Sequence, residues 1–287
     1  MSSFDRQFYL STNPDVAASG IDPETHYRRY GRFEGRQGCQ TDIAVKPAAV
    51  SALFPGICSE IHPDDEMYKV AARNPDIRYP DALYMSTGNW IYEDIMCSLR
   101  GANINLSTVS SVLDFASGYG RVTRFWLKQF HAADVWVADV QHSAVDFLMT
   151  RFGVNGLYPL YEPTSDLFPR QFELISVVSL FSHLPEIRTK QWLISLVDAL
   201  APGGTLVFSF HGDHLLEPEL RSSVGDAHMF FPSSESTVLP VSEYGTTYLS
   251  HDYLVHILDD IEGITLARMY QRGLCDFQDL AVITRSL

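Results

Sequence analysis

Apolar runs and amphipathic stretches alternate along most of this chain. Continuous apolar runs, which are typical of strands buried on both faces, occupy residues 111–116, 134–140, 172–181 and 204–210. Amphipathic stretches with helical spacing, at residues 122–131, 143–152 and 187–200, lie between most of these runs. The alternation predicts βαβ units, in which a parallel sheet is covered by helices.

The last two strand candidates are connected differently. Residues 265–270 and 280–285 are joined by QRGLCDFQD, a segment too short to hold a crossover helix. These two strands must therefore be antiparallel neighbours. With a third strand near Tyr158, we expect an α/β protein with a doubly wound, mostly parallel sheet of about seven strands that ends in an antiparallel hairpin.

The first 61 residues have a different texture. Residues 4–36 hold two short helical patterns, with Asp22-Pro23 as the N-cap and first residue of one helix. Residues 37–61 show little periodicity and are interrupted by proline and glycine, which predicts a linker with one short helix. The predicted domains are a small helical appendage at residues 1–36, a linker at 37–61 and the α/β domain at 62–287.

Charge and composition exclude several classes of protein. Asp and Glu number 35 against 21 Lys and Arg, a net charge of -14, so the average surface field would repel nucleic acid and anionic bilayers. No apolar run approaches the roughly 18 residues of a membrane span, and the N-terminus lacks a signal-peptide pattern. The four cysteines show no CxxC spacing, which favours a reducing compartment, the cytoplasm.

The segment SVLDFASGYGRVTRFW, residues 111–126, places a turn of small residues between a buried strand and a helix. Ligands of open α/β sheets bind at the carboxyl ends of the strands, where glycines allow close approach of the backbone, so we expect a nucleotide-like ligand here. A dinucleotide motif is excluded because its last small residue would fall on Arg121 or Thr123. A Walker P-loop is excluded because no Gly-Lys-Ser/Thr follows.

Asp114 is followed by small residues at Ala116, Gly118 and Gly120, with Ser117 between them, and this pattern resembles the D-x-G-x-G-x-G motif of class I S-adenosylmethionine-dependent methyltransferases. The resemblance implies a Rossmann-like fold in which the acid and the turn cradle the methionine and ribose end of S-adenosylmethionine. Ala116 replaces the usual first glycine; this costs little if its φ is negative, whereas a left-handed turn would count against the assignment. FELISVVSLFSHLPE and LAPGGTLVFSFHG also resemble the fourth and fifth strand segments, and the resemblance, to a bacterial subgroup, covers residues 63–285.

Three further residues are candidates for binding the cofactor. Asp139 ends the strand VWVADV, 19 residues after Gly120, at about the spacing where an acid accepts hydrogen bonds from ribose hydroxyls; capping of the next helix is the alternative. In related enzymes the loop after the third strand meets the adenine, which implies Glu162 as an acceptor for its amine. Tyr84 precedes the first motif and is a candidate lid over the cofactor, with a plain helix-entry turn as the alternative.

Methyl transfer draws its reactivity from the cofactor, so the protein mainly supplies proximity and a dry pocket. A hydroxyl or ammonium acceptor must lose a proton, and a histidine is the natural base near neutral pH. His183 follows the fourth strand and His211 ends the fifth, so both are candidate catalytic bases. The sequence favours His211, because it opens onto a long segment that could cover a substrate; a role in supporting the backbone before Pro185 is the alternative for His183. The His-x-Asp-His cluster that begins at His211 is not completed by further ligands, so no metal is predicted.

The sequence therefore predicts a cytoplasmic S-adenosylmethionine-dependent methyltransferase that acts on a small molecule or a sugar or glycan precursor. Residues 4–36, with the pattern YL-x-x-NPDVA…HY…G-x-x-EGR, resemble a short module that accompanies bacterial glycosyltransferases, and they are a candidate surface for a protein partner. The alternative is a non-catalytic module that binds a cofactor or partner in an assembly system. The segment between Gly212 and Tyr248 is long for a connection, which predicts either a cover for the acceptor or a packed flap.

Overall fold

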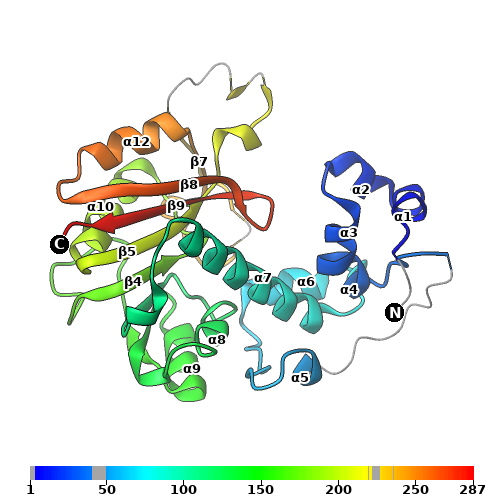
Figure 1. Ribbon diagram of the computed structural model, residues 1–287, viewed down its shortest axis with the longest axis horizontal. Helices are drawn as coiled ribbons and strands as arrows, with labels where there is room; N and C mark the ends of the chain where they lie inside the picture. The colour runs from blue at the N-terminus through cyan, green and yellow to red at the C-terminus, as the bar shows by residue number, and fades with distance from the viewer. Residues whose placement is uncertain (1–3, 41–49, 219, 222–226, 235) are drawn as a thin grey trace. The chain divides into compact units, whose positions relative to one another are not determined.

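The computed structural model of the chain describes residues 4–40, 50–218, 220–221, 227–234 and 236–287. Its contacts form two units, Met1–Ile91 and Tyr92–Leu287, which divide within the long helix α7 (Pro80–Gly101) rather than in the segment predicted to be a linker (Figure 1). No helix in the described part of the chain is both long enough and apolar enough to cross a membrane.

The first unit is helical. Asp22 caps one of its helices by accepting a hydrogen bond from the backbone N–H of Thr25, and Pro23 is the first helical residue, as the sequence predicts. A short π-helix at Tyr27–Gly31 follows directly. The α-helices of this unit are α1 (Arg6–Thr12), α2 (Pro14–Ser19), α3 (Pro23–His26, the helix that Asp22 caps), α4 (Arg32–Glu34), α5 (Val50–Leu53), α6 (Glu66–Arg73) and the first part of α7.

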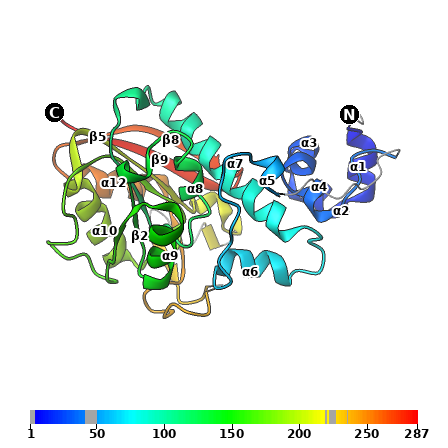
Figure 2. The ribbon, with the colours of Figure 1, turned by 90° about the horizontal axis from the view of Figure 1, so that it is seen from below.

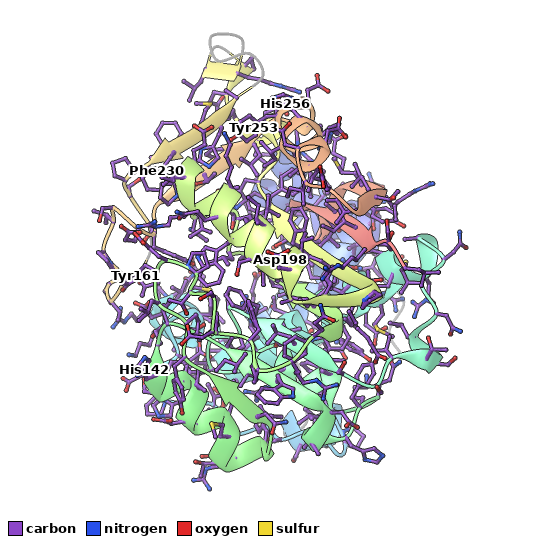
Figure 3. The ribbon with its side chains drawn as sticks, turned by 90° about the vertical axis from the view of Figure 1, so that its left-hand side faces the viewer. His142, Tyr161, Asp198, Phe230, Tyr253 and His256 are labelled. Atoms are coloured by element: carbon purple, nitrogen blue, oxygen red, sulfur yellow. The ribbon has the colours of Figure 1, made fainter. Side chains whose placement is uncertain are left out.

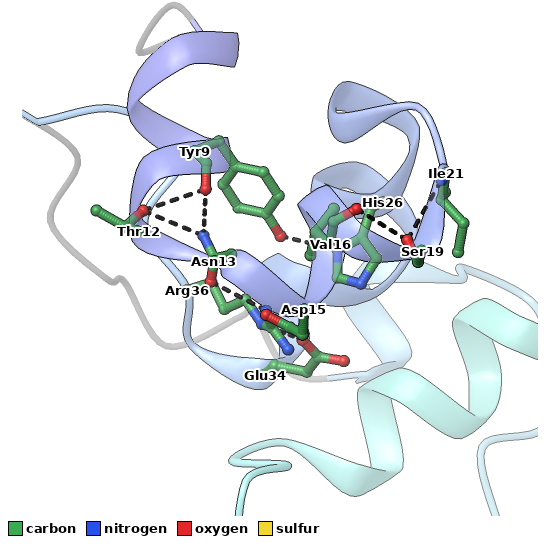
Figure 4. A network of polar contacts seen from close by, with 10 residues as sticks. All are labelled: Tyr9, Thr12, Asn13, Asp15, Val16, Ser19, Ile21, His26, Glu34 and Arg36. Atoms are coloured by element: carbon green, nitrogen blue, oxygen red, sulfur yellow. Dashed lines mark hydrogen bonds and ion pairs between the residues drawn. The ribbon is translucent and has the colours of Figure 1, made fainter.

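A partly buried polar network joins the helices of residues 4–36 (Figure 4). The hydroxyl of the fully buried Tyr9 lies 2.9 Å from Nδ1 of His26. The guanidinium of Arg36 donates to Oδ1 of Asn13 at 3.0 Å and to Oδ1 of Asp15 at 2.8 Å. Arg36 is therefore neutralised by an acidic side chain of the same unit.

The second unit is built on a seven-stranded sheet in the order β3-β2-β1-β4-β5-β9-β8 (Figures 1 and 2). The first five strands are parallel, while β9 is antiparallel to both β5 and β8. This confirms the predicted doubly wound, mostly parallel sheet with an antiparallel C-terminal hairpin. The strands are β1 (Val112–Phe115), β2 (Val135–Ala138), β3 (Asn155–Leu157), β4 (Phe172–Val177), β5 (Leu200–Phe210), β8 (Ile264–Leu274) and β9 (Gln278–Arg285).

Helices cover the sheet as its connections require. Crossovers between parallel strands are right-handed. In the strand order given above, the chain moves one way across the sheet from β1 to β3 and the other way from β4 to β5. The helices of these two steps therefore lie on opposite faces of the sheet. Apolar side chains of α10 and α12 share one core cluster with β1 and β5, including Phe115, Leu193, Phe208 and Leu258. The helices are α8 (Thr123–Trp126), α9 (His142–Phe152), α10 (Glu186–Asp198) and α12 (His251–Asp259).

Two local predictions need correction. The amphipathic stretch at residues 122–131 forms only the single turn α8, after which Lys128 and Gln129 make i to i−3 hydrogen bonds that end the helix. The long segment after β5 contains an unforeseen antiparallel pair, β6 (His228–Phe231) and β7 (Thr246–Leu249). We call residues 228–249 the flap.

Candidate functional site

The candidate site lies at the carboxyl edge of the parallel strands. The strand order reverses between β1 and β4, and such a switch point leaves a crevice where the loops after these strands diverge. The small-residue turn follows β1, Asp139 follows β2, His183 lies after β4, and His211 follows β5. The topology therefore gathers at one edge residues that the sequence scatters over about a hundred positions.

Asp114 is a buried carboxyl inside β1. Its Oδ2 accepts a hydrogen bond of 2.6 Å from the hydroxyl of Thr123, which is also fully buried. Burial, opposed by the Thr123 hydroxyl and assisted by the nearby Asp139 carboxyl, raises the pKa of Asp114 to about 7. Without a cationic ligand, this carboxyl therefore holds its proton up to about neutral pH.

Asp139 links the turn after β1 to the start of α9. Its Oδ2 accepts from the backbone N–H of Gly118 at 2.8 Å, and its Oδ1 accepts from the backbone N–H of Gln141 at 2.9 Å. Burial raises the pKa of Asp139, and these two hydrogen bonds partly offset that effect. Each carboxylate oxygen has a second lone pair, so Asp139 can support the backbone and still accept from a ligand.

The turn itself is left-handed at three positions. Ala116, Gly118 and Gly120 have φ values of 59°, 51° and 78°. Ala116 therefore has the conformation that counts against the sequence assignment, at a cost of about 1–2 kcal/mol for a residue with a Cβ. The sheet sustains this strain, because the N–H of the next residue, Ser117, donates to the carbonyl of Ala138 in β2 at 3.1 Å.

Gly118 faces open space. A Cβ built on it would meet no atom within 4 Å, apart from its chain neighbours. The turn thus presents bare backbone to open space beside the Asp139 carboxyl, which is what close approach of a ligand requires.

Arg124 supports the turn from behind and was missed by sequence reasoning. Its side chain is 1% exposed, and its Nε donates to the carbonyl of Gly120 at 2.8 Å. A single arginine in a helical pattern normally lies at the surface, so the sequence carries no signal for this role.

His183 has a defined tautomer. Its Nδ1 lies 2.7 Å from the carbonyl oxygen of Gly245, and since a carbonyl only accepts, Nδ1 carries the proton. The lone pair of the neutral ring is therefore on Nε2. The ring of Tyr244 stacks on the imidazole with 4.2 Å between centroids and 13° between planes.

His211 is buried in a neutral form. Burial, followed by the nearby His183, lowers the pKa of His211 to about 4. Its Nε2 lies 3.3 Å from the amide nitrogen of Gln278, and its Nδ1 has no hydrogen bond although it is buried. The rings of His183 and His211 are 6.1 Å apart, so the structure brings the two candidate bases together. A pKa near 4 leaves His211 able to accept a proton but weak as a base at neutral pH.

Two more residues at this edge were not foreseen. Ser179, just after β4, is left-handed with a φ of 57°, and its N–H donates to the hydroxyl of Ser209 at 2.7 Å. The fully buried carboxylate of Asp279 accepts from Nε2 of His251 at 2.6 Å. Strained backbone and buried charged groups are common at functional sites. Neither can be predicted from the sequence, because both depend on how the strands lie beside one another.

The other two predicted cofactor residues are engaged elsewhere. Glu162 is 64% exposed, and its carboxylate pairs with Arg188 at 2.5 Å. Tyr84 belongs to the first unit, where it is buried and its hydroxyl donates to the carboxylate of Asp65. Their proposed roles at the adenine and as a lid remain predictions.

The His-x-Asp-His cluster that begins at His211 lies directly after β5. Within the described ranges, no three His, Cys, Asp or Glu side chains are grouped as metal ligands. His214 instead lies with its Nδ1 3.6 Å from Oδ2 of Asp279.

Comparisons with known proteins agree with the fold. Residues 113–206, from β1 to β5, match a family model described as a methyltransferase domain. A search of the curated proteins found no relative of this sequence. The matched stretch includes the turn, Asp139 and His183, whereas His211 lies beyond its end.

Three solved structures illustrate the likeness. An S-adenosylmethionine-dependent methyltransferase from Clostridium acetobutylicum has a TM-score of 0.50 at 12% identity, over 69% of this chain and 92% of that one. An amino pentose methyltransferase of calicheamicin biosynthesis from Micromonospora echinaspora, with S-adenosylmethionine bound, has 0.48 at 15% identity, over 69% and 94%. An N-methyltransferase from Bradyrhizobium japonicum, in complex with S-adenosylhomocysteine, has 0.47 at 16% identity, over 77% and 99%. At such identities, the likeness is one of fold.

Proposed function

We propose that this chain is an S-adenosylmethionine-dependent methyltransferase that acts on a small molecule or a sugar or glycan precursor. The observation that carries the proposal is the open, left-handed turn at Gly118, whose N–H is held by the buried Asp139 carboxylate beside the buried Asp114. This turn lies in the stretch that matches a methyltransferase domain.

The residues present fit this cofactor. Asp139 retains acceptor capacity for ribose hydroxyls, and Asp114 offers a carboxyl that ionises readily beside a cation. The backbone from Ala116 to Gly120, including Ser117, would form the cradle, with Glu162 as the proposed adenine acceptor. When bound, the cofactor would supply a methyl group on a sulfonium, which passes to an attacking acceptor while S-adenosylhomocysteine leaves in line.

The chain's own contribution to chemistry is a proton acceptor. Of the two histidines we favour His183, because its Nδ1–H is held by the carbonyl of Gly245 and its lone pair is therefore on Nε2. A hydroxyl acceptor would pass its proton to this nitrogen as it attacks, whereas an ammonium acceptor would lose its proton to this nitrogen before it attacks. His211 stays neutral at every physiological pH, and its low pKa suits it to hydrogen bonding with the acceptor more than to taking its proton.

The net charge of -14 disfavours nucleic acid as the acceptor. The absence of CxxC spacing in the sequence supports the proposal that the enzyme acts in a bacterial cytoplasm. A protein partner for residues 4–36 stays a prediction.

The test is calorimetric titration with S-adenosylhomocysteine, followed by transfer of a labelled methyl group from S-adenosylmethionine to a panel of amino and hydroxy sugars and their nucleotide conjugates. Binding and transfer support the proposal. Absence of binding would overturn it. Binding without transfer to any acceptor would favour the alternative of a non-catalytic module.

Affinity for the cationic S-adenosylmethionine is expected to rise with pH from 5.5 to 7 and then level off. Asp114 attracts the cation only when its carboxyl is ionised. Because the pKa of this carboxyl is about 7, its ionised fraction, and with it the affinity, falls by up to about tenfold per pH unit below neutrality. Titrations in two buffers of different ionisation enthalpy should detect proton release at pH 6. The Asp114→Asn variant should bind weakly with no such slope; a slope that persists would assign the proton to another group.

The raised pKa of Asp114 should also make the stability of the ligand-free protein depend on pH. Between pH 4 and 7, the folded state keeps a proton on Asp114 that the unfolded chain has released, so stability should fall as pH rises through this range. Urea unfolding of the wild type and of Asp114→Asn at pH 5 and pH 7 measures this difference.

Replacing His183 by asparagine is expected to lower the turnover number about 10²- to 10⁴-fold with little change in cofactor affinity, because the lost proton transfer develops only in the transition state. The asparagine amide can still donate to Gly245, so the loop should stay in place. His211→Asn should cost less in turnover. The reverse order would make His211 the base, and two unaffected variants would leave catalysis to proximity alone.

A further inference from the structure

The flap is docked onto the loop between β4 and α10. The N–H of Gly245 donates to the carbonyl of His183 at 2.8 Å, and the N–H of Thr247 donates to the carbonyl of Ser182 at 2.8 Å. The hydroxyl of Thr247 donates to the carbonyl of Leu184 at 2.6 Å. Three hydrogen bonds thus join Gly245 and Thr247, at the start of the second strand of the flap, to three consecutive residues of the loop.

Side chains extend this docking to the start of α10. Nε of Arg188 donates to the carboxylate of Glu243 at 2.9 Å, and the hydroxyl of Thr189 lies 3.2 Å from Nε2 of His228. Both strands of the flap are therefore tied to the same short stretch of chain, on either side of His183.

At His183 the contact is reciprocal. Gly245 donates its N–H to the backbone carbonyl of His183 and accepts the imidazole Nδ1–H at 2.7 Å on its own carbonyl. Tyr244, one residue earlier, lies flat against the imidazole, 13° from parallel. One dipeptide of the flap therefore determines both the tautomer and the plane of the ring.

We propose that Tyr244 and Gly245 are positioning residues for His183, which hold its imidazole with the proton on Nδ1 and the lone pair on Nε2. The tautomer of a neutral histidine is set by the hydrogen bond that the other nitrogen makes, and a base that must first rotate or change tautomer loses effective orientation. The catalytic meaning of this arrangement rests on the proposed function, whereas the arrangement itself can be tested without it.

This assignment gives the long segment after β5 a different role from a simple cover. The sequence leaves two roles open for this segment, a cover for the acceptor or a packed flap. The flap is packed, and its packing acts on a residue of the candidate site. Disturbing the flap should therefore change the chemistry at His183 before it changes cofactor binding.

The first experiment is direct. Protein labelled with ¹⁵N at the histidine rings is examined by long-range proton–nitrogen NMR, which distinguishes a protonated from an unprotonated ring nitrogen. The His183 signals are assigned by their loss in His183→Asn. We expect proton on Nδ1 and a lone pair on Nε2 at pH 8, with and without S-adenosylhomocysteine. A proton on Nε2 would overturn the proposal.

Two substitutions of His183 separate its two nitrogens. The amide nitrogen of asparagine occupies about the position of Nδ1, whereas that of glutamine occupies about the position of Nε2. His183→Asn should keep the amide of Gly245 protected from hydrogen exchange, while His183→Gln should speed its exchange about fivefold to tenfold, as loss of one buried hydrogen bond requires. Equal protection in both variants would show that the side chain does not anchor the flap.

Tyr244→Phe and Tyr244→Leu test the stacked ring. Phenylalanine keeps the flat face and should preserve the tautomer, while leucine should give averaged nitrogen shifts from mixed tautomers. His256→Gln is the matched control, since His256 is an exposed residue of α12 (Figure 3) and does not belong to the flap. A leucine variant with an unchanged tautomer signature would remove Tyr244 from the proposal.

Failure of this inference and failure of the proposed function give different results. If S-adenosylhomocysteine does not bind but the His183 tautomer is as expected, the methyltransferase proposal fails and the positioning stands. If the cofactor binds and the tautomer is wrong, the positioning fails and the enzyme proposal stands.

Discussion

Gly118→Val is expected to weaken S-adenosylhomocysteine roughly 100-fold while the protein stays folded. The space beside this residue is open, so a valine side chain would enter the volume proposed for the cofactor rather than the protein core. A β-branched residue at a φ of 51° also strains the turn. Backbone strain and steric overlap with the cofactor would each make the free energy of binding less favourable by about 1–3 kcal/mol. Calorimetry measures the binding, and normal affinity would place the pocket elsewhere.

Gly120→Ala is the matched control, because it lies two residues away and has the opposite environment. A Cβ there would lie 2.3 Å from Cδ2 of Leu148 and 3.0 Å from Cε2 of Phe152, both in α9. This substitution should therefore cost about 2–4 kcal/mol in stability, measured by urea unfolding, through overpacking and a positive φ. The pair distinguishes a glycine needed for a ligand from one needed for packing.

Asp139→Ala is expected to weaken S-adenosylhomocysteine by about 1.5–3 kcal/mol for each charged hydrogen bond lost, or roughly tenfold to 150-fold. The structure adds a second effect, since the same carboxylate holds the N–H groups of Gly118 and Gln141. Unfolding and binding must therefore both be measured.

Asp22→Ala serves as the control for Asp139→Ala. Asp22 also accepts a backbone N–H at a helix start, but in the first unit, so its loss should cost about 0.5–2 kcal/mol of stability and no affinity. If Asp139→Ala behaves like Asp22→Ala, Asp139 is a cap and does not bind ribose.

Local patterns predicted the sheet well because each depends on neighbours along the chain. Apolar runs identified the buried parallel strands, and the nine-residue connection QRGLCDFQD forced the antiparallel pairing that β8 and β9 adopt. The prediction was wrong for the helix at residues 122–131, because spacing alone does not show where hydrogen bonding changes from i−4 to i−3.

The sequence by itself determined the fold class, the turn after β1 and the place of Asp114 and Asp139 at strand ends, because strand, turn and helix signals are local. Only the tertiary structure decided the protonation and orientation of the site. The pKa of Asp114 follows from how many strands and helices bury it, and the tautomer of His183 follows from a carbonyl 62 positions away at Gly245. Such properties arise when distant segments exclude water and pair their polar groups, and no pattern of neighbouring residues encodes that pairing.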